Sequence, residues 1–243
     1  MVHIILTGAT GLVGSGVLQQ MLANDAISRI SILSRRPVKM AEGHEDKAKV
    51  IIHKDFKTYD EALLDQLKDA TGCVWALGGS QNDVSQEQYF EMTHDYPLEA
   101  SKAFSKLHPD SPFTFVHVSA EGATQSPGMF TPVYGRVKGQ AEQALFEFSK
   151  SLPNFNIYNV RPAGVDWRHH PEIHPFMPNQ AAYKKILIGP IDMVYKNMVT
   201  PTKPLGKILT ELAMSKGESL QGKDIQMEGR LVSNIAIRRM AGL

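Results

Sequence analysis

Tyr134 and Lys138 are four residues apart in a segment whose apolar spacing predicts a helix over residues 133–149. Side chains at this spacing share one helix face. A free tyrosine has a pKa of about 10. An ammonium group about 4 Å away stabilises the phenolate by about 4 kcal/mol at an effective dielectric of about 20. The pair therefore predicts a proton donor, Tyr134, whose acidity is increased by Lys138.

Ser119 directly follows a predicted strand over residues 113–118. The carboxyl ends of parallel strands face the ligand crevice of an open sheet, so we expect the Ser119 hydroxyl there, with Tyr134 brought alongside by the next helix. A serine hydroxyl can hold a carbonyl oxygen while a tyrosine donates a proton to it. These three catalytic candidates predict reduction of a carbonyl by hydride transfer.

A glycine-rich loop lies between the first predicted strand, residues 3–6, and the first predicted helix, residues 12–23, and reads TGATGLVG. Gly8 permits a tight turn, Gly11 lets the backbone approach a pyrophosphate, and Gly14 lets the helix pack closely. The free N–H groups and the dipole of the helix attract phosphates. We therefore expect cofactor contacts from Gly8, Thr10, Gly11, Leu12, Val13 and Gly14.

Arg35 and Arg36 follow the second predicted strand, residues 30–33. Folds that prefer NAD place an acidic residue here to bind the ribose 2′-hydroxyl, whereas an arginine accommodates a 2′-phosphate. Guanidinium groups form paired, charge-assisted hydrogen bonds to phosphate. The two arginines favour NADP(H) over NAD(H) as the cofactor.

The predicted elements alternate between short apolar strands and longer helices over the first two-thirds of the chain. This alternation predicts an α/β fold with a doubly wound parallel sheet of the Rossmann type, an αβα sandwich. Further strands are expected over residues 50–52, 73–77, 156–160 and 224–227, and further helices over 62–67, 86–107, 205–214 and 232–240. Pro97 predicts a kink or break within residues 86–107.

Residues 162–204 hold seven of the fourteen prolines, so we expect long loops with short helices that cover the substrate side of a single domain, residues 1–243. His169, His170 and His174 lie in this segment. Their spacing in a proline-broken loop matches no usual metal-ligand pattern. A loop that faces the substrate is the favoured interpretation, and no metal site is expected.

The composition excludes several classes of protein. The 26 Lys and Arg residues nearly balance the 25 Asp and Glu residues, which argues against nucleic acid as a partner. No apolar run is long enough for a membrane span, and no secretory signal is recognised at the start. A single cysteine, Cys73, suits a reducing compartment, so a cytoplasmic location is expected. A homo-oligomer or a protein partner stays open.

The chain resembles the short-chain dehydrogenase/reductase superfamily, and more narrowly its atypical, epimerase-related members of similar size. These include the Tat-interacting oxidoreductase-like and the nucleoside-diphosphate-sugar-epimerase-like proteins. The resemblance covers roughly residues 2 to 166. It is carried by the glycine loop, residues 76–79, 94–98 and 118–119, Tyr134 with residues 137–139 and Glu142, and residues 160–165.

The resemblance implies further roles along the chain. Asp55 and Phe56 would flank the adenine, and Lys138 would hold the nicotinamide ribose. Family members often supply an asparagine from the long helix, where this chain has Thr93 or His94. Ser119 and Tyr134 would also contact the cofactor. The remaining implied contacts are Ala76, Leu77 and Gly78 along the ribose, and Pro162, Ala163, Gly164 and Val165 over the nicotinamide.

These observations predict an NADP(H)-dependent oxidoreductase that acts on a carbonyl or hydroxyl of a small-molecule substrate. A redox-sensing regulatory protein that binds NADP(H) without turnover is the alternative, because a fold does not determine a function. A nucleotide-sugar epimerase is less favoured, since the 243-residue chain lacks the length of a sugar-nucleotide domain.

Overall fold

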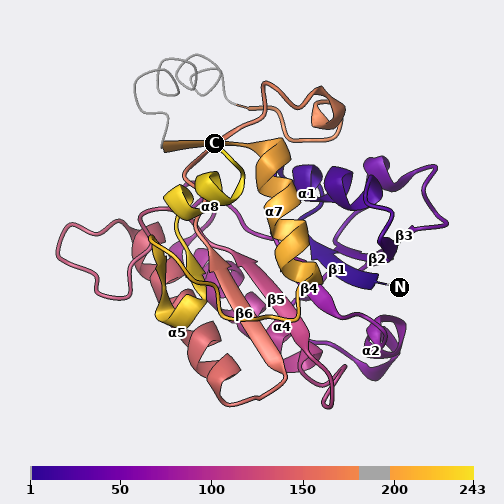
Figure 1. Cartoon of the computed structure of the whole chain (residues 1–243), viewed down its shortest axis with the longest axis horizontal. Coiled ribbons are helices and arrows are strands. Elements are labelled where there is room, and N and C mark those ends of the chain that lie inside the picture. Colours follow the sequence, from indigo (N-terminus) through magenta and orange to yellow (C-terminus); the bar gives the residue numbers. More distant parts are fainter. Residues whose placement is uncertain (1, 181–197) are drawn as a thin grey trace.

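A central eight-stranded sheet organises the chain, which the computed structural model describes over residues 2–180 and 198–243. Its strands are β1 (Val2–Thr7), β2 (Ile27–Ser34), β3 (Ala48–Ile52), β4 (Gly72–Trp75), β5 (Phe113–Val118), β6 (Phe155–Val160), β9 (Ile225–Gln226) and β10 (Leu231–Val232). They lie in the order β3-β2-β1-β4-β5-β6-β10-β9, and every neighbouring pair is parallel except β10 with β9 (Figure 1). The order reverses between β1 and β4, which is the topological switch point at which such sheets bind ligands.

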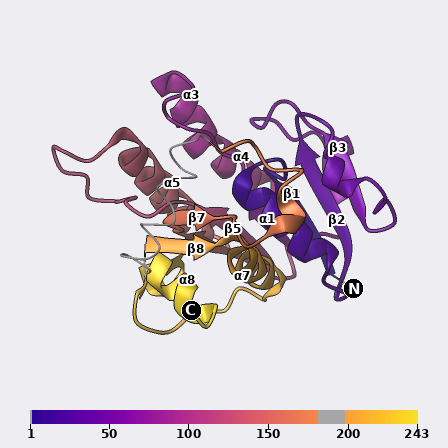
Figure 2. The ribbon, with the colours of Figure 1, turned by 90° about the horizontal axis from the view of Figure 1, so that it is seen from above.

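Helices cover both faces of the sheet, as expected. They are α1 (Leu12–Leu22), α2 (Glu61–Leu67), α3 (Gln86–Phe90), α4 (Tyr96–Phe104), α5 (Val133–Lys150), α7 (Thr202–Met214) and α8 (Asn234–Met240). Figure 2 shows α3, α4 and α5 on the side of the sheet opposite α7 and α8. The predicted doubly wound α/β fold is therefore confirmed. No helix within the described ranges has the length and apolar character needed to cross a membrane.

Alternate residues of the strands fill two separate cores. In β1, Ile4 and Leu6 pack into the core that includes α1 and α7, while Ile5 packs into the core that includes α2, α4 and α5. All three side chains are fully buried. Burial on both faces explains why the strands read as continuous apolar runs rather than as an alternating pattern.

Helices α1 and α7 cross at two glycines. A Cβ atom on Gly206 would lie 2.6 Å from the Gly16 carbonyl oxygen, and one on Gly16 would lie 3.2 Å from the Thr202 carbonyl oxygen. The missing side chains let the two helix backbones approach each other closely. Because α1 begins directly after the glycine loop, this contact also fixes the position of that loop over the sheet.

The expected break near Pro97 is present. The segment predicted as one helix consists of α3, a π-helical turn over Glu91–Asp95, and α4. Proline has no N–H group and cannot donate a helical hydrogen bond to the carbonyl four residues before it, here that of Thr93. The wider turn before Pro97 accommodates this loss, and such π-turns are frequent at functional sites.

The proline-rich segment contains more strand than expected. Two short strands, β7 (Gly164–Asp166) and β8 (Val199–Pro201), pair in parallel, and a 3-10 turn covers Pro171–Ile173. The remainder of the predicted covering segment, residues 181–197, lies outside the described residues. The helix predicted from Val232 begins instead at Asn234, because Leu231 and Val232 pair with β6 as strand β10.

Two histidines are buried in the strands. His117 in β5 is 2% exposed, and its Nδ1 lies 2.8 Å from Asn159 Oδ1. Burial, with the nearby positive charge of Lys138, lowers the pKa of His117 to about 3. Burial likewise lowers the pKa of His3 to about 4. Both side chains are therefore neutral in the folded protein at every pH above about 5.

These histidines predict a loss of stability in mild acid. Between pH 6.5 and the lower folded-state pKa, only the unfolded chain binds the proton, so unfolding becomes more favourable as the pH falls. We expect His117 to contribute about 2 kcal/mol of the decrease in the free energy of unfolding between pH 7 and pH 5. Chemical denaturation at pH 7 and at pH 5 measures the free energy of unfolding at each pH. The decrease between the two should be about 2 kcal/mol smaller in His117→Gln than in the wild-type protein.

The matched control is His44→Gln, at an exposed position. It should leave the difference between the two pH values as it is in the wild-type protein. If the free energy of unfolding of His117→Gln decreased between pH 7 and pH 5 by as much as that of the wild-type protein, the assignment of this acid sensitivity to His117 would be contradicted.

Candidate active site

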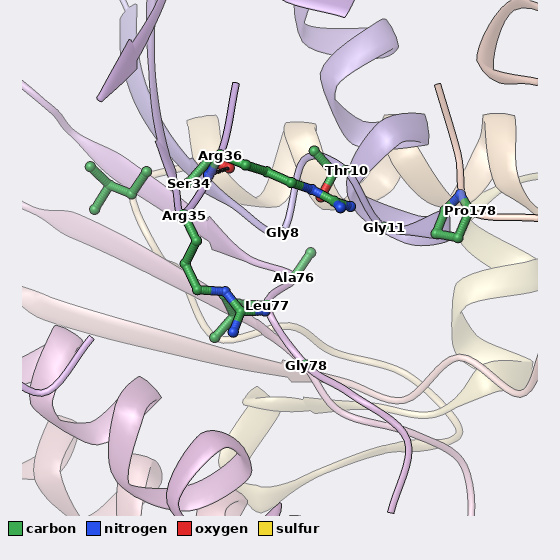
Figure 3. Close-up of a pocket in the computed structure, with 11 residues that line it drawn as sticks. Gly8, Thr10, Gly11, Ser34, Arg35, Arg36, Ala76, Leu77, Gly78 and Pro178 are labelled. Carbon is green, nitrogen blue, oxygen red and sulfur yellow. Dashed lines mark hydrogen bonds between the residues drawn. The ribbon is translucent and has the colours of Figure 1, made fainter. Parts of the chain in front are cut away.

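A cavity of about 560 Å³ opens at the carboxyl ends of β1, β2 and β4 (Figure 3). It lies at the switch point between β1 and β4, where the chain topology favours a ligand. It is lined by Gly8, Thr10, Gly11, Leu33, Ser34, Arg35, Arg36, Ala76, Leu77, Gly78 and Pro178. Eight of these residues are among those predicted to bind the cofactor. Leu33, Ser34 and Pro178 are additional.

The glycine loop is shaped by backbone contacts that exclude side chains. Gly8 has φ +72°, and a Cβ atom there would lie 2.3 Å from the Ala76 carbonyl oxygen. A Cβ atom on Gly14 would lie 2.0 Å from the Gly8 carbonyl oxygen. Gly11 is less confined, because among the described residues a Cβ atom there would come close to the Gly8 carbonyl oxygen alone, at 3.2 Å, apart from its own neighbours in the chain. Gly8 and Gly14 thus build the turn, while Gly11 leaves room beside the cavity.

Helix α1 starts at this turn without a side-chain cap. Gly11 is its N-cap residue, and the Gly11 N–H donates to the Gly8 carbonyl at 2.8 Å. The first-turn N–H groups of a helix have no intrahelical acceptor. Those of Leu12, Val13 and Gly14, together with the helix dipole, can bind an anion such as a pyrophosphate.

The two arginines extend along different walls of the cavity (Figure 3). Arg36 reaches toward the glycine loop, where its Nη2 donates to Thr10 Oγ1 at 3.2 Å. Arg35 extends toward Ala76 and Leu77. Neither guanidinium group forms an ion pair with a carboxylate in the described ranges of the chain. Two exposed, uncompensated cations at this position suit a phosphate.

Asp55 and Phe56 lie in the loop after β3 and differ in what they can offer. The exposed Asp55 carboxylate accepts hydrogen bonds from the Lys57 N–H and the Thr58 hydroxyl, both at 3.0 Å, which lower the pKa of Asp55. The Phe56 ring is fully buried and lies 5.8 Å from the ring of Trp75. Its side chain belongs to the core, so only the Phe56 backbone is free to contact an adenine.

Tyr134 lies in the first turn of α5, beside the loop that follows β5. Gly122 in this loop has φ +86°, and a Cβ atom on it would lie 2.6 Å from the Tyr134 hydroxyl oxygen. The same loop is fastened to α5, because the Thr124 N–H donates to the Gly135 carbonyl at 3.0 Å. A Cβ atom on Gly139 would lie 1.8 Å from the Thr124 carbonyl oxygen. Small residues on α5 therefore let the β5 loop hold the phenol over Gly122.

Lys138 lies one helical turn after Tyr134. Desolvation lowers the pKa of Lys138 to about 8, and the Glu142 carboxylate opposes this shift. Its ammonium group forms no hydrogen bond or ion pair within residues 2–180 and 198–243. An ammonium group that is partly desolvated and has free donors can bind a hydroxyl group of a ligand.

The Ser119 hydroxyl is committed to another partner, contrary to its expected role beside the substrate. It is 4% exposed and donates to Glu142 Oε1 at 2.5 Å. The fully buried Glu142 also accepts from Arg161 Nε at 2.8 Å and from Gln125 Nε2 at 2.5 Å. Ser119 therefore belongs to a buried ion-pair cluster, and the next residue, Ala120, carries no hydroxyl. The geometry does not support Ser119 as the group that orients a substrate oxygen.

The turn from Pro162 to Val165 lies at the carboxyl end of β6 and outside the 560 Å³ cavity. The Pro162 carbonyl accepts the Glu121 N–H at 2.9 Å, and the Ala163 N–H donates to Asn234 Oδ1 at 2.9 Å. Gly164 and Val165 form β7. The turn is thus tied to the β5 loop and to α8, while its contact with a nicotinamide stays a prediction.

The histidines of the covering segment hold that segment to the fold. His170 is 1% exposed, and its two ring nitrogens lie 2.9 Å from Thr202 Oγ1 and 3.1 Å from Gln19 Oε1. His174 Nε2 lies 2.8 Å from the Trp167 carbonyl oxygen. These hydrogen bonds hold both rings, while the expectation that the loop faces a substrate stays a prediction. The two histidines connect the loop to α1, α7 and its own backbone.

Thr93 and His94 lie in the π-helical turn between α3 and α4. Thr93 is 6% exposed, whereas the His94 ring stacks on Phe90 and its Nδ1 lies 2.8 Å from Asp95 Oδ1. Thr93 and His94 are the residues at the position where family members often have an asparagine. The His94 ring already contacts Phe90 and Asp95.

The chain is similar in sequence to two proteins that are named for biosynthesis clusters. The leucinostatins biosynthesis cluster protein T of Purpureocillium lilacinum is 33% identical over 259 residues, covering 97% of this chain and 94% of that protein. The botcinic acid biosynthesis cluster B protein 16 of Botryotinia fuckeliana is 37% identical over 155 residues, covering 60% of this chain and 98% of that protein. No family model matches the chain.

Solved structures share the fold at low sequence identity. A short-chain dehydrogenase/reductase from Saccharomyces cerevisiae has a TM-score of 0.68 at 14% identity, covering 96% of each chain. A 3-oxoacyl-[acyl-carrier protein] reductase from Brucella melitensis in complex with NAD has a TM-score of 0.67 at 15% identity, covering 97% of this chain and 96% of that chain.

The chain has the Rossmann fold that these two solved structures share. It belongs to the same family as the leucinostatins biosynthesis cluster protein T. Membership of the short-chain dehydrogenase/reductase superfamily stays a prediction. The narrower resemblance to Tat-interacting oxidoreductase-like proteins stays a prediction.

Proposed function

We propose that this chain is an NADP(H)-dependent oxidoreductase that acts on a carbonyl or hydroxyl group of a small organic substrate. The observation that carries the proposal is the cavity at the β1–β4 switch point, built by the glycine turn and by Arg35 and Arg36, which form no ion pair with a carboxylate among the described residues. Tyr134 lies beside the loop after the neighbouring strand, β5. A related fold, the Brucella reductase, is in complex with NAD.

The residues present fit a dinucleotide with a 2′-phosphate. The turn from Gly8 to Gly14 would hold the pyrophosphate, because it leaves first-turn N–H groups free and keeps side chains away. Arg35 and Arg36 would hold the 2′-phosphate, and Asp55 the adenine. Bound NADPH would supply the hydride that adds to the carbonyl carbon, and in the reverse direction bound NADP+ would accept the hydride that leaves the hydroxyl-bearing carbon.

Tyr134 supplies the proton in this proposal. As the new C–H bond forms, the carbonyl electrons move to the oxygen, and the Tyr134 hydroxyl donates its proton there. In the reverse direction the phenolate accepts that proton. Lys138, with a pKa of about 8, is mostly protonated at neutral pH, and its charge stabilises the phenolate. Because the Ser119 hydroxyl donates to Glu142, the Tyr134 hydroxyl would also bind the substrate oxygen.

Replacing Tyr134 by phenylalanine tests the proton donor. We expect Tyr134→Phe to lower kcat by at least about 100-fold, the usual contribution of a positioned acid, and to leave the Kd for NADPH within about twofold. NADPH absorbance over a panel of carbonyl compounds gives kcat, and calorimetry gives Kd. Unaltered turnover in this variant would remove Tyr134 from its proposed role.

Removing both arginines tests the choice of cofactor. We expect Arg35→Ala with Arg36→Ala to raise the Kd for NADPH by about 100-fold, because hydrogen bonds to charged groups contribute about 1.5–3 kcal/mol each. The Kd for NADH should change by less than about threefold. The control is Lys54→Ala, which removes an exposed positive charge outside the cavity. Equal losses for both dinucleotides would contradict the 2′-phosphate assignment.

One observation favours a second function, a redox-sensing regulatory protein that binds NADP(H) without turnover. The hydroxyl expected to orient a substrate belongs to the Glu142 cluster, so the site has one polar group fewer than predicted for catalysis. Tight NADPH binding with no turnover across the carbonyl panel would support the sensor over the enzyme.

We further propose that residues 162–204 cover the substrate side of a single domain. Pro178 from this segment lines the cavity, and His170 fastens the segment to α1 and α7. The cytoplasmic location and any oligomeric state stay predictions.

A further inference from the structure

Gln81 lies on the loop after β4, which forms one wall of the cavity through Leu77 and Gly78. The start of this loop is tied to the glycine turn, because the Leu77 N–H donates to Thr7 Oγ1 at 3.2 Å. Further on, the Asp83 N–H donates to the Ser80 carbonyl at 3.1 Å and closes a turn around Gln81. The position of Gln81 is therefore set by the same backbone segment that lines the cavity.

The Gln81 side chain reaches the helix that carries Tyr134. Its Oε1 accepts the Tyr134 backbone N–H at 2.8 Å, a contact between residues 53 positions apart. Helix α5 follows Pro132, which provides no side-chain cap, so first-turn N–H groups need acceptors from elsewhere. Gln81 supplies the acceptor at the residue that carries the reacting hydroxyl.

We propose that Gln81 is a positioning residue that couples the dinucleotide site to Tyr134. Its amide oxygen fixes the start of α5, and it lies three residues after Gly78 on the cavity wall. Occupancy of the cavity is therefore transmitted to Tyr134 through one loop and one hydrogen bond. The proposal rests on the proposed role of Tyr134 in the reaction.

The hydrogen bond from the Tyr134 N–H to Gln81 influences the position of the Tyr134 hydroxyl. The Tyr134 hydroxyl lies at the far end of the side chain, over Gly122, so a small rotation of the first turn displaces it. A misplacement of about 1 Å can lower a rate by about 100-fold. The β5 loop holds the other side of this turn through the Thr124 N–H and the Gly135 carbonyl. Gln81 and Thr124 thus fix α5 from two different strand ends.

Amide hydrogen exchange tests the bond without relying on turnover. The seven tyrosines of the ¹⁵N-tyrosine-labelled protein give seven backbone amide signals, and the signal lost in Tyr134→Phe belongs to Tyr134. Gln81→Met keeps the side-chain length and removes the acceptor, whereas Gln81→Glu keeps an acceptor. We expect exchange at Tyr134 about tenfold faster in Gln81→Met and unchanged in Gln81→Glu. Added NADPH should slow exchange at Tyr134 in the wild-type protein and in Gln81→Glu, which have the acceptor. It should not slow exchange in Gln81→Met.

Turnover supplies the second measurement. With a reactive carbonyl compound, Gln81→Met should lower kcat by about 10- to 100-fold and leave the KM for NADPH within about twofold. Gln81→Glu should restore kcat. The control, Asn82→Leu, alters an exposed side chain of the same loop and should match the wild-type protein in both measurements.

Each outcome decides a separate claim. Unchanged Tyr134 exchange in Gln81→Met, or faster exchange with unchanged kcat, would overturn the positioning role. Gln81→Glu behaving like Gln81→Met would overturn the acceptor argument. Activity that persists in Tyr134→Phe would overturn the proposed function instead, while the exchange data would still decide whether Gln81 holds the Tyr134 N–H and responds to NADPH.

Discussion

Backbone segments from β1, α1 and β4 meet at the glycine turn at distances that no side chain would tolerate. A Cβ atom on Gly8 would clash with the Ala76 carbonyl oxygen, and one on Gly14 with the Gly8 carbonyl oxygen. The close fit holds the start of α1 against the sheet at the point where the strand order reverses. Because the N-cap of α1 is glycine, the first-turn N–H groups stay free for an anion. Arg35 and Arg36, which follow β2, and the loop after β4 complete the cavity around this turn.

A second constraint lies under α5, where several polar groups are buried together. Glu142 accepts hydrogen bonds from Ser119, Gln125 and Arg161, so its charge is neutralised locally by Arg161. Such a pair is costly to break, since removing one partner leaves a buried charge uncompensated. Lys138 lies one turn away without a partner in the described chain, and burial lowers its pKa to about 8. Lys138 and Tyr134 lie one helical turn apart on α5, and the proposed effect of the Lys138 charge on Tyr134 depends on this spacing.

Much of this architecture was readable from residue types and spacing. The glycine loop was recognisable because it connects a predicted strand to a predicted helix, and the arginine position follows from the next strand end. Pro97 marked the break in the long helical segment because of its missing N–H group. Strands of two or three residues, such as β7, β8 and β10, were missed because they are too short to show a period.

The contacts at the site that sequence reasoning did not anticipate join distant segments. Ser119 stands where a strand end predicts a ligand contact, but a carboxylate 23 positions away takes its hydroxyl. Phe56 was placed beside the adenine, although its ring fills the core next to Trp75. Gln81 carried no signal, because a side chain that caps a helix from a remote loop depends on tertiary structure alone. Pro178 was found only as part of a proline-rich segment.

A crystal structure of the chain with NADPH tests the central claim most directly. We expect the pyrophosphate at the turn from Gly8 to Gly14 and the 2′-phosphate between Arg35 and Arg36. We also expect the nicotinamide ring within reach of the Tyr134 hydroxyl. A dinucleotide bound elsewhere, or a nicotinamide ring turned away from Tyr134, would contradict the proposed site.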